Sequence, residues 1–238
     1  MVLFLASAST VASVIYVWIW DLVRRNWRWI YSIDNLAVIG FVSENYNKIL
    51  SELQRNKVFP LLLNQVASAG RVNIVVTDNQ TEIAKNIIET EIFGKPKVVH
   101  LALIGHGNVG GTLMEQILDS SHDILNRKRL QLKVVAIANS KKIAFNKAGF
   151  GSDWRQKIKY SQTDSSVDSL FNFAKENHLE NLVMVDNTAS KDFVKNYPIF
   201  VENGFDVVGS NKIYNTLPIS EYKNFRTDLE KNKKQYLY

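Results

Sequence analysis

The 238-residue chain contains no cysteine. Disulfide bonds and zinc sites with thiolate ligands are therefore excluded, and the absence fits a reducing compartment. The sequence also shows no Ser/His/Asp triad signature and no H-E-x-x-H zinc motif. Its four histidines are isolated in the sequence, at His100, His106, His122 and His178. We therefore predict no metal site and assign no histidine to catalysis.

The sequence also lacks the features of a nucleic-acid-binding protein. The net charge is +6, and the positive residues gather in short runs such as Arg127–Arg129 and Lys231–Lys234. Such runs usually form a solvated helix face, and no interleaved aromatic–basic motif or recognition helix accompanies them. With 46% hydrophobic residues the composition is that of a globular protein. We therefore predict no nucleic-acid partner.

Residues 2–20 contain no charged side chain, and arginines follow them closely. By its length this stretch is a transmembrane candidate, with Trp18, Trp20 and the arginines at one interface. It could also serve as a signal sequence, but no basic n-region precedes it. The alternative is a pair of buried strands, Val2–Ala6 and Val14–Trp20, around a turn of small residues. From the pattern alone, the membrane segment and the pair of strands are nearly equally well supported interpretations.

The next part of the chain predicts the order strand, helix, strand, strand, helix. The expected strands are Leu36–Val42, Val58–Leu63 and Val72–Val76, and the expected helices are Glu44–Asn56 and Asp78–Phe93. This order makes up most of a β-α-β-β-α-β module, and Pro60 suits an edge strand. Gly94–Pro96 interrupts the pattern. We therefore place a domain boundary between residues 1–94 and residues 95–238.

The second domain is organised around Val98–Gly111, with the sequence VVHLALIGHGNVGG. An apolar run leads into glycines with G-x-G-x-x-G spacing, and an apolar-periodic segment, Val109–Leu118, follows them. This order of parts predicts a buried strand that turns tightly into a helix. Three glycines can also form a plain tight turn, but the flanking strand and helix favour a nucleotide site.

Each glycine of the motif has its own expected role. Gly105 permits the tight turn, Gly107 lets a pyrophosphate approach the backbone, and Gly110 lets the helix pack closely on the strand. The free N–H groups at the start of the helix, at Asn108 and Val109, favour bound phosphate together with the helix dipole. We predict that these five residues contact the cofactor.

Strands and helices alternate after the glycine-rich unit. The expected strands are Leu132–Ala138, Leu182–Val185 and Asp206–Val208, and the expected helices are Ser166–Asn177, Ala189–Asn203 and Ile219–Lys233. Residues 139–159 are mostly polar and predict an irregular segment. The alternation predicts parallel crossovers in a doubly wound α/β sheet. Ligands bind such sheets beyond the carboxyl ends of the strands, where the polar residues of this half gather.

The end of the second strand of this half carries no carboxylate that could hold an adenosine ribose. Asn139 and Ser140 can instead hydrogen-bond a ribose or phosphate, and Lys141 and Lys142 can neutralise a 2′-phosphate. These residues favour NADP over NAD as the cofactor, with NAD still possible. The alternative is that the lysine pair is ordinary surface.

Polar residues after the third and fourth strands are further candidates. Thr188 and Ser190 can cap the following helix, and their hydroxyls can at the same time face the nicotinamide end of a cofactor. Lys212 comes just after a short buried strand and can hold substrate or cofactor. Its alternative interpretation is a solvated lysine.

Four segments together resemble homoserine dehydrogenase of the bifunctional aspartokinase–homoserine dehydrogenase family. They are LIGHGNVGGTLMEQIL (103–118), VVAIANSKK (134–142), VMVDNTAS (183–190) and GFDVVGSNKIYNT (204–216). The resemblance implies NAD(P)-dependent interconversion of L-homoserine and L-aspartate 4-semialdehyde, a cytoplasmic step towards threonine and methionine. It also implies a homo-oligomer and a catalytic lysine, Lys212, between nicotinamide and substrate. Asn187 and Ser210 depart from the family, which often has cysteine and proline there.

The resemblance extends upstream of the glycine-rich unit. Residues 72–94 and 36–42 are similar to parts of an ACT domain, and residues 2–17 are similar to a strand–turn–strand of a preceding ACT repeat. It favours strands over a membrane anchor for the first stretch. The expected fold is thus a doubly wound, Rossmann-type parallel sheet preceded by a partial α+β, ferredoxin-like ACT region.

Compared with that family, the kinase domain and the substrate half of the dehydrogenase lie outside these 238 residues. We therefore expect a fragment that binds cofactor but is catalytically incomplete. Two alternatives stay open from the sequence. One is a non-enzymatic ACT-linked module that senses a dinucleotide or amino acid, and the other is a membrane-tethered dinucleotide-binding protein.

Overall fold

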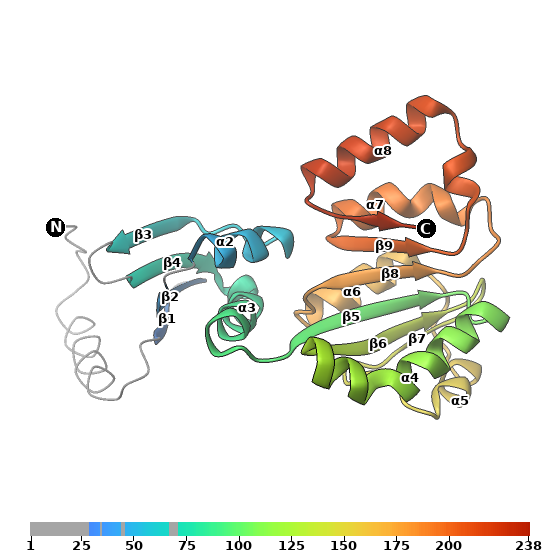
Figure 1. Ribbon diagram of the computed structural model, residues 1–238, viewed down its shortest axis with the longest axis horizontal. Helices are drawn as coiled ribbons and strands as arrows, with labels where there is room; N and C mark the ends of the chain where they lie inside the picture. Colours follow the sequence, from blue (N-terminus) through green and yellow to red (C-terminus); the bar gives the residue numbers. More distant parts are fainter. Residues whose placement is uncertain (1–28, 34, 44–45, 67–70) are drawn as a thin grey trace.

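The computed structural model describes residues 29–238, apart from residues 34, 44–45 and 67–70. It contains a four-stranded sheet and a six-stranded sheet, and the chain passes from the first to the second at residues 94–96 (Figure 1). The two interpretations of residues 2–20 fall outside the described residues. Within the described part, no helix is both long enough and apolar enough to cross a membrane.

The four-stranded sheet is antiparallel and has the strand order β1-β2-β4-β3. Its elements are β1 (Trp29–Ile33), β2 (Leu36–Val42), α2 (Tyr46–Arg55), β3 (Leu62–Val66), β4 (Arg71–Thr77) and α3 (Thr81–Phe93). From β2 to α3 the elements follow the predicted order, and β1 adds an edge strand beside β2. Alternate residues of β4 are buried, which is the period of a sheet with one covered face. Helices α2 and α3 supply the other half of this core.

The predicted strand Val58–Leu63 is wrong in its bounds, because β3 begins only at Leu62. The amide of Val58 donates to the carbonyl of Leu53 at 2.9 Å and so closes the end of α2. Pro60 then has no N–H to give to a sheet. Pairing with β4 starts at the amide of Leu61, which donates to Val75 at 2.7 Å.

The six-stranded sheet has the order β10-β9-β8-β5-β6-β7. Its strands are β5 (Lys97–Ile104), β6 (Leu130–Ala138), β7 (Ile143–Phe145), β8 (Leu182–Asp186), β9 (Phe205–Gly209) and β10 (Tyr236–Leu237). Every pair is parallel except β6–β7. The predicted doubly wound parallel sheet is confirmed, with an antiparallel edge strand that lies in the segment predicted to be irregular.

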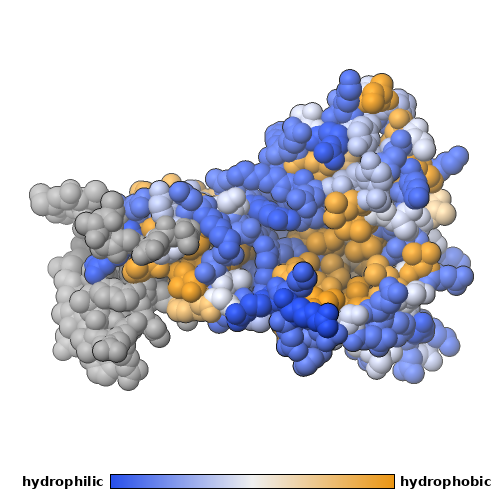
Figure 2. Space-filling view, in the orientation of Figure 1, coloured by the Kyte–Doolittle hydropathy of each residue, from blue (hydrophilic) through white to orange (hydrophobic). Residues whose placement is uncertain are grey.

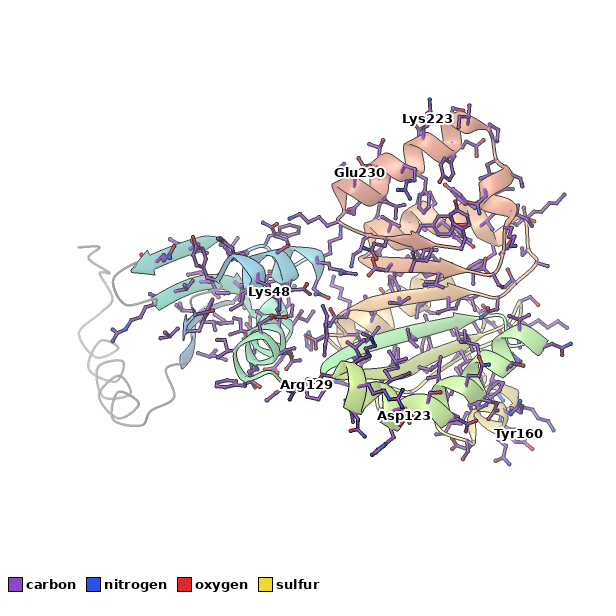
Figure 3. The ribbon with its side chains drawn as sticks, in the orientation of Figure 1. Lys48, Asp123, Arg129, Tyr160, Lys223 and Glu230 are labelled. Carbon is purple, nitrogen blue, oxygen red and sulfur yellow. The ribbon has the colours of Figure 1, made fainter. Side chains whose placement is uncertain are left out.

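Helices cover both faces of this sheet. They are α4 (Asn108–Lys128), α5 (Trp154–Lys159), α6 (Val167–Glu176), α7 (Tyr197–Glu202) and α8 (Ile219–Lys231). Helices α4 and α5 pack on one face, and α6, α7 and α8 pack on the other. Helix α8 buries Phe225 and Leu229, whereas Lys223 and Glu230 lie on its exposed side (Figure 3). On the face of α4, apolar side chains gather in a hollow over the strands between α4 and α8 (Figure 2).

The predicted helix Ala189–Asn203 is also too long. A loop comes first, followed by a 3₁₀ turn, η3 (Phe193–Asn196), and then by α7. The side-chain amide of Asn211 donates to the carbonyl of Ser190 at 3.1 Å. The first part of the segment is thereby held as a loop by a residue that follows β9.

Polar contacts join the two units at the amino ends of the parallel strands. Arg55 at the end of α2 donates to the carboxylate of Asp206 at 2.8 Å, and Lys97 at the start of β5 pairs with Glu52 at 2.5 Å. The side-chain oxygen of Asn56 accepts from the amide of Asn181 at 2.6 Å. The first unit therefore contacts the amino edge of the six-stranded sheet. The carboxyl edge, on the other side, stays open (Figure 1).

Candidate functional site

The loops after four parallel strands interlock at the carboxyl edge of the six-stranded sheet. The amide of Gly105 donates to Ala138 at 2.8 Å, which ties the loop after β5 to the end of β6. The amide of Asn187 donates to Ile104 at 2.8 Å, and the amide of Ser210 donates to Asp186 at 2.9 Å. The structure thus brings together the four loops in which the sequence placed the candidate residues.

Two glycines of the motif are required by the fold itself. Gly105 has φ +84°, and a Cβ atom there would lie 2.9 Å from Cγ2 of Thr188 and 3.0 Å from the carbonyl carbon of Asn187. A Cβ atom on Gly110 would lie only 1.9 Å from the carbonyl oxygen of Gly105. A side chain at either position would force neighbouring atoms to shift, and at Gly105 it would also have to adopt a left-handed backbone conformation.

Gly107 is different, because nothing in the fold requires a glycine there. Its φ is −66°, and a Cβ atom would meet no atom of the described residues within 4 Å, its chain neighbours apart. Gly107 precedes the first turn of α4, whose amides have no partner within the helix. Asn108 and Val109 lie exposed in that turn, with Val109 58% exposed. The open space beside free amides fits a phosphate group, so the residues present suit a dinucleotide.

The loop after β6 has one free lysine and one paired lysine. The side-chain oxygen of Asn139 accepts from the amides of Lys141 and Lys142, both at 2.8 Å. The ammonium of Lys142 pairs with Asp164 at 2.8 Å, and this hydrogen bond lowers the pKa of the Asp164 carboxyl. Lys141 and Ser140 are exposed, and the structure gives the Lys141 ammonium no partner within the described chain. Of these two lysines, Lys141 is thus the one that no carboxylate of the described chain already engages.

Sequence reasoning missed an aromatic cluster beside the glycine turn. The ring of His106 meets the ring of Trp154 edge-on, with ring centroids 5.9 Å apart, and its Nε2 lies 3.2 Å from the side-chain Nδ2 of Asn139. The guanidinium of Arg155 stacks over Trp154 at 4.4 Å and pairs with Glu115. In the sequence, the one signal for this cluster was Trp154, a tryptophan within a mostly polar segment. The cluster joins the loops after β5 and β6.

Asp186, at the end of β8, organises the other side of the site. Its side chain is fully buried, and it accepts from the amide of Thr188 at 2.7 Å, the hydroxyl of Tyr197 at 2.7 Å and the amide group of Asn211 at 3.2 Å. Burial and this hydrogen bond raise the pKa of Tyr197 well above its usual range, so its hydroxyl stays a donor. One carboxylate thereby holds the loops after β8 and β9 together.

The remaining candidates lie on those two loops. The hydroxyl of Thr188 accepts from the amide of Ser190 at 3.3 Å, and the hydroxyl of Ser190 accepts from the amide of Phe193 at 3.1 Å. Ser190 thus contacts the first residue of η3, but the cap position of that turn is Asp192, whose side chain makes no capping hydrogen bond. The predicted capping of a helix by Thr188 or Ser190 is therefore not observed, and contact with a nicotinamide stays a prediction. Lys212 is exposed before η4 (Ile213–Thr216). The side-chain nitrogen of Asn187 is buried beside Gly110 without a hydrogen-bond partner among the described residues.

No group of three or more histidine, aspartate or glutamate side chains in the described part of the chain could hold a metal ion. The candidate site is thus made of backbone amides, hydroxyls, amides and lysines. This donor set suits an anionic, hydroxyl-rich ligand such as a dinucleotide.

Comparisons with known proteins agree with this geometry. Residues 105–238 match the family model of the homoserine dehydrogenase NAD-binding domain. The chain is 32% identical over 212 residues to the bifunctional aspartokinase/homoserine dehydrogenase of Buchnera aphidicola, covering 86% of this chain and 26% of that protein. The Haemophilus influenzae enzyme of the same name is 28% identical over 214 residues, which is 87% of this chain and 26% of that protein. The chain therefore spans about a quarter of the length of these relatives.

One solved structure shares the fold over more than half of the chain. It is a Candida auris protein described as being of unknown function, with a TM-score of 0.51 and 21% identity. The match covers 60% of this chain and 38% of that one. The likeness therefore concerns the fold alone.

Proposed function

Since the chain belongs to the homoserine dehydrogenase family, with residues 105–238 matching its NAD-binding domain, we propose that it holds NADP(H) at the carboxyl edge of the six-stranded sheet. We further propose that the bound cofactor exchanges hydride between L-homoserine and L-aspartate 4-semialdehyde. Hydride transfer is the chemistry of the cofactor, and the protein supplies position and electrostatics.

The observation that carries this proposal is the open space at Gly107. Gly105 and Gly110 are explained by contacts inside the protein, but Gly107 is not. A glycine that the fold does not need, placed before free helix amides, is explained by a ligand that approaches the backbone. The side-chain amide of Asn187, buried and without a partner in the described part of the chain, supplies a further donor beside the same turn.

A preference for NADP over NAD is proposed from the loop after β6. This loop offers no carboxylate to the ribose hydroxyls, and Lys141 is exposed and unpaired within the described residues. Lys142 contributes less, because its ammonium is already paired with Asp164. The 2′-phosphate of NADP would therefore be held mainly by Lys141.

At the nicotinamide end we propose that Asp186 acts as a positioning residue and Lys212 as a substrate ligand. Asp186 fixes Thr188 and Asn211 through hydrogen bonds. Lys212 follows Asn211 directly, and its ammonium could stabilise negative charge that develops on the substrate oxygen. In an active form of the enzyme, Lys212→Ala should lower homoserine-dependent NADPH formation more than it weakens NADPH binding. Full activity of that variant would remove Lys212 from the site.

We propose that the first unit is an ACT-like regulatory region, with its boundary at residues 94–95. The order β2-α2-β3-β4-α3, with β4 between β2 and β3, matches most of a ferredoxin-like module. Strand β1 takes the edge beside β2, where the last strand of such a module would lie. Deleting residues 1–94 should leave NADPH binding in place if this region regulates rather than forms the site.

The direct test is a titration of the purified chain with NADPH and NADH, followed by nucleotide fluorescence. We expect saturable binding of both, with NADPH the tighter ligand. A chain that is folded by circular dichroism and binds neither nucleotide at concentrations up to about 1 mM, which corresponds to a weak binding free energy, would refute the proposed function.

A further inference from the structure

A lysine side chain is buried where the two units meet, in the link between α8 and β10. Lys234 is only 5% exposed, and its Nζ has no hydrogen-bond partner among the described residues. The backbone amide of Lys234 donates to the carbonyl of Leu229 at 2.8 Å, which holds the link against the end of α8. A buried ammonium without a partner is costly, whereas a neutral amine costs much less. The position of Lys234 therefore favours the uncharged form of its side chain.

The residues just before Lys234 contact the first unit. Nζ of Lys233 donates to the side-chain oxygen of Gln54 on α2 at 2.5 Å. Nζ of Lys57, in the turn after α2, donates to Oδ1 of Asn232 at 2.5 Å. The link that carries Lys234 is therefore part of the contact that joins the two units.

The carboxylates of Asp206 and Glu52, which act on Lys234, are engaged by other groups. Asp206, at the start of β9, accepts from Arg55 at 2.8 Å and from the backbone amide that follows Lys234, also at 2.8 Å. Glu52, on α2, is paired with Lys97 at 2.5 Å. Neither carboxylate thus forms an ion pair with the Lys234 ammonium.

The charged groups around Lys234 come from both units. Burial lowers the pKa of Lys234 from its ordinary 10.5 to about 8. Asp206 on β9 and Glu52 on α2 oppose this shift, whereas Arg55 and Lys57 add to it. Glu52, Arg55 and Lys57 belong to the first unit, so two of its cations and one of its carboxylates act on the amine. The docked first unit therefore favours the neutral amine.

We propose that Lys234 makes the docking of the two units pH-dependent, with tighter docking as the amine loses its proton. The contribution of Lys234 is fully present above pH 10.5 and is lost as the pH falls through 8, because its pKa is lowered in the docked state. Between pH 7 and pH 9 the docking equilibrium constant should rise by about tenfold, since separation returns the amine to its ordinary pKa. This proposal does not depend on nucleotide binding at the carboxyl edge of the sheet.

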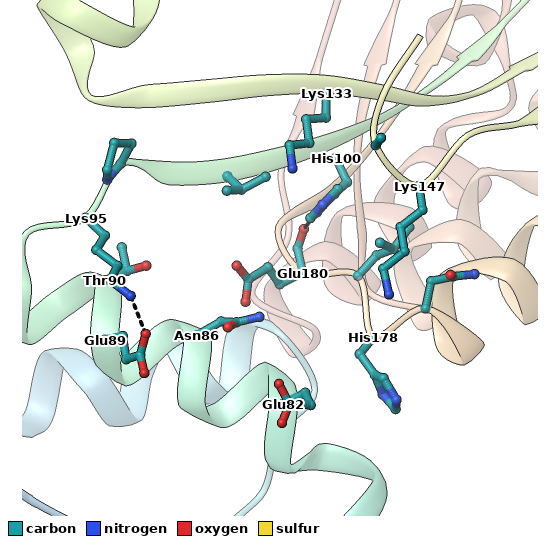
Figure 4. A pocket seen from close by; sticks show the side chains of 15 residues that line it. Glu82, Asn86, Glu89, Thr90, Lys95, His100, Lys133, Lys147, His178 and Glu180 are labelled. Atoms are coloured by element: carbon teal, nitrogen blue, oxygen red, sulfur yellow. Dashed lines mark hydrogen bonds and ion pairs between the residues drawn. The ribbon is translucent and has the colours of Figure 1, made fainter. Parts of the chain in front are cut away.

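Two other groups at the contact between the units also titrate. Glu180 points into a cavity of about 550 Å³ between α3 and the amino ends of β5, β6 and β8, and burial raises its pKa to about 7 (Figure 4). Burial lowers the pKa of Lys57, with Glu202 opposing the shift and Lys231 adding to it. A comparison at each pH of chains that differ only at Lys234 separates its effect from theirs.

The amide of Asn181 reports directly on docking, because it donates across the contact to the side-chain oxygen of Asn56 at 2.6 Å. Hydrogen exchange of the whole 238-residue chain, followed by NMR at several pH values between 7 and 9, measures its protection after correction for the intrinsic exchange rate. We expect the protection factor of this amide to rise by about tenfold over that range in the parent chain. In Lys234→Met it should be higher at pH 7 and nearly constant, and the exposed-site variant Lys223→Met should behave as the parent chain does.

Urea unfolding of the same chains shows whether the effect of Lys234 belongs to docking. A gain in stability of Lys234→Met at pH 7 without a change in the protection of the Asn181 amide would place the buried amine within the second unit alone and overturn the proposal. A protection factor that changes with pH equally in the parent and in Lys234→Met would also overturn it. If Lys234→Met fails to fold, Lys234→Gln takes its place, and a parent protection factor that is constant from pH 7 to pH 9 contradicts the proposal without any variant.

Discussion

A Cβ atom on Gly110 would lie 1.9 Å from the carbonyl oxygen of Gly105. This approach packs the first turn of α4 against the turn that leaves β5. Gly105 adopts φ +84° in the same turn, whereas Gly107 lies between them with an ordinary backbone and open surroundings. Glycine therefore stands at the three positions of this motif for different physical reasons. Gly105 and Gly110 serve the fold, and we propose that Gly107 leaves room for a ligand.

Gly110→Ala should destabilise the protein, because the clash is with backbone and cannot be relieved by a side-chain rotation. We expect a loss of about 1–3 kcal/mol in the free energy of unfolding, the usual cost of overpacking. Gly107→Ala is the matched control and should change stability by about 0.5 kcal/mol or less. Urea unfolding followed by circular dichroism measures both. Equal midpoints for the two variants would contradict the close approach at Gly110.

Tyr197→Phe should also lower stability, because it removes a 2.7 Å donor from the buried carboxylate of Asp186. The expected cost is about 1.5–3 kcal/mol, as for hydrogen bonds to charged groups. Tyr160→Phe is the control, since Tyr160 is 68% exposed. Thermal unfolding of the two variants compares them. A Tyr197→Phe protein as stable as the Tyr160→Phe protein would mean that the hydroxyl does not support Asp186.

The nucleotide preference should depend on Lys141. Lys141→Ala should weaken the binding of NADPH by about 1–3 kcal/mol and leave the binding of NADH nearly unchanged, because only NADPH carries the 2′-phosphate. Lys142→Ala should have a smaller effect, since Lys142 is engaged by Asp164. Asn139→Asp keeps an oxygen for the amides of Lys141 and Lys142 and should shift the preference towards NADH. An unchanged NADPH/NADH affinity ratio in all three variants would show that this loop does not read the phosphate.

The stability of the protein should depend on the ionisation of Glu180. Its folded-state pKa, about 7, is raised above the ordinary 4.5, so the folded state binds the proton more tightly than the unfolded state. This contribution favours folding below pH 4.5 and is lost as the pH rises to about 7. As the pH rises from 4.5 to 8, the free energy of unfolding of Glu180→Gln should therefore increase relative to that of the parent chain, by on the order of 2–3 kcal/mol.

Urea unfolding of both chains at several pH values measures that difference. Comparing the two chains at each pH separates Glu180 from His100, whose pKa is lowered by burial and whose effect on stability is lost as the pH falls. Lys97, Lys133 and Lys147 are the cationic side chains nearest to Glu180, and Lys97 and Lys133 oppose the effect of burial on its pKa. A difference between parent and variant that does not change with pH would contradict the raised pKa.

Much of the fold was predictable because periodicity reports burial. Leu36–Val42 was predicted with its observed bounds, since its apolar residues form one short run that the sheet buries. The strand, glycine turn and helix around Gly105–Gly110 were predictable for a similar reason. Strand β7 was missed because it has three residues and polar neighbours, so too few positions repeat to show a period.

The site was predictable only where it depends on local sequence. The candidate loops follow strands, and the sequence located them. Pairings across the chain gave no local signal. Asn211 fixes the loop at Ser190, Asp164 neutralises Lys142, and Glu180 meets α3 only after the two units dock. These contacts depend on tertiary packing between residues that are far apart in the sequence.

We propose above all that Gly107 leaves room for a dinucleotide. Gly107→Val places a branched side chain in that space, where a Cβ atom would meet no described residue within 4 Å apart from its chain neighbours. Fluorescence titration of the parent and variant chains with NADPH, together with their melting temperatures, measures the consequence. We predict closely similar melting temperatures and an NADPH affinity lower by about tenfold or more in the variant, a loss of at least 1.4 kcal/mol. Equal NADPH affinities in two equally folded chains would contradict the account.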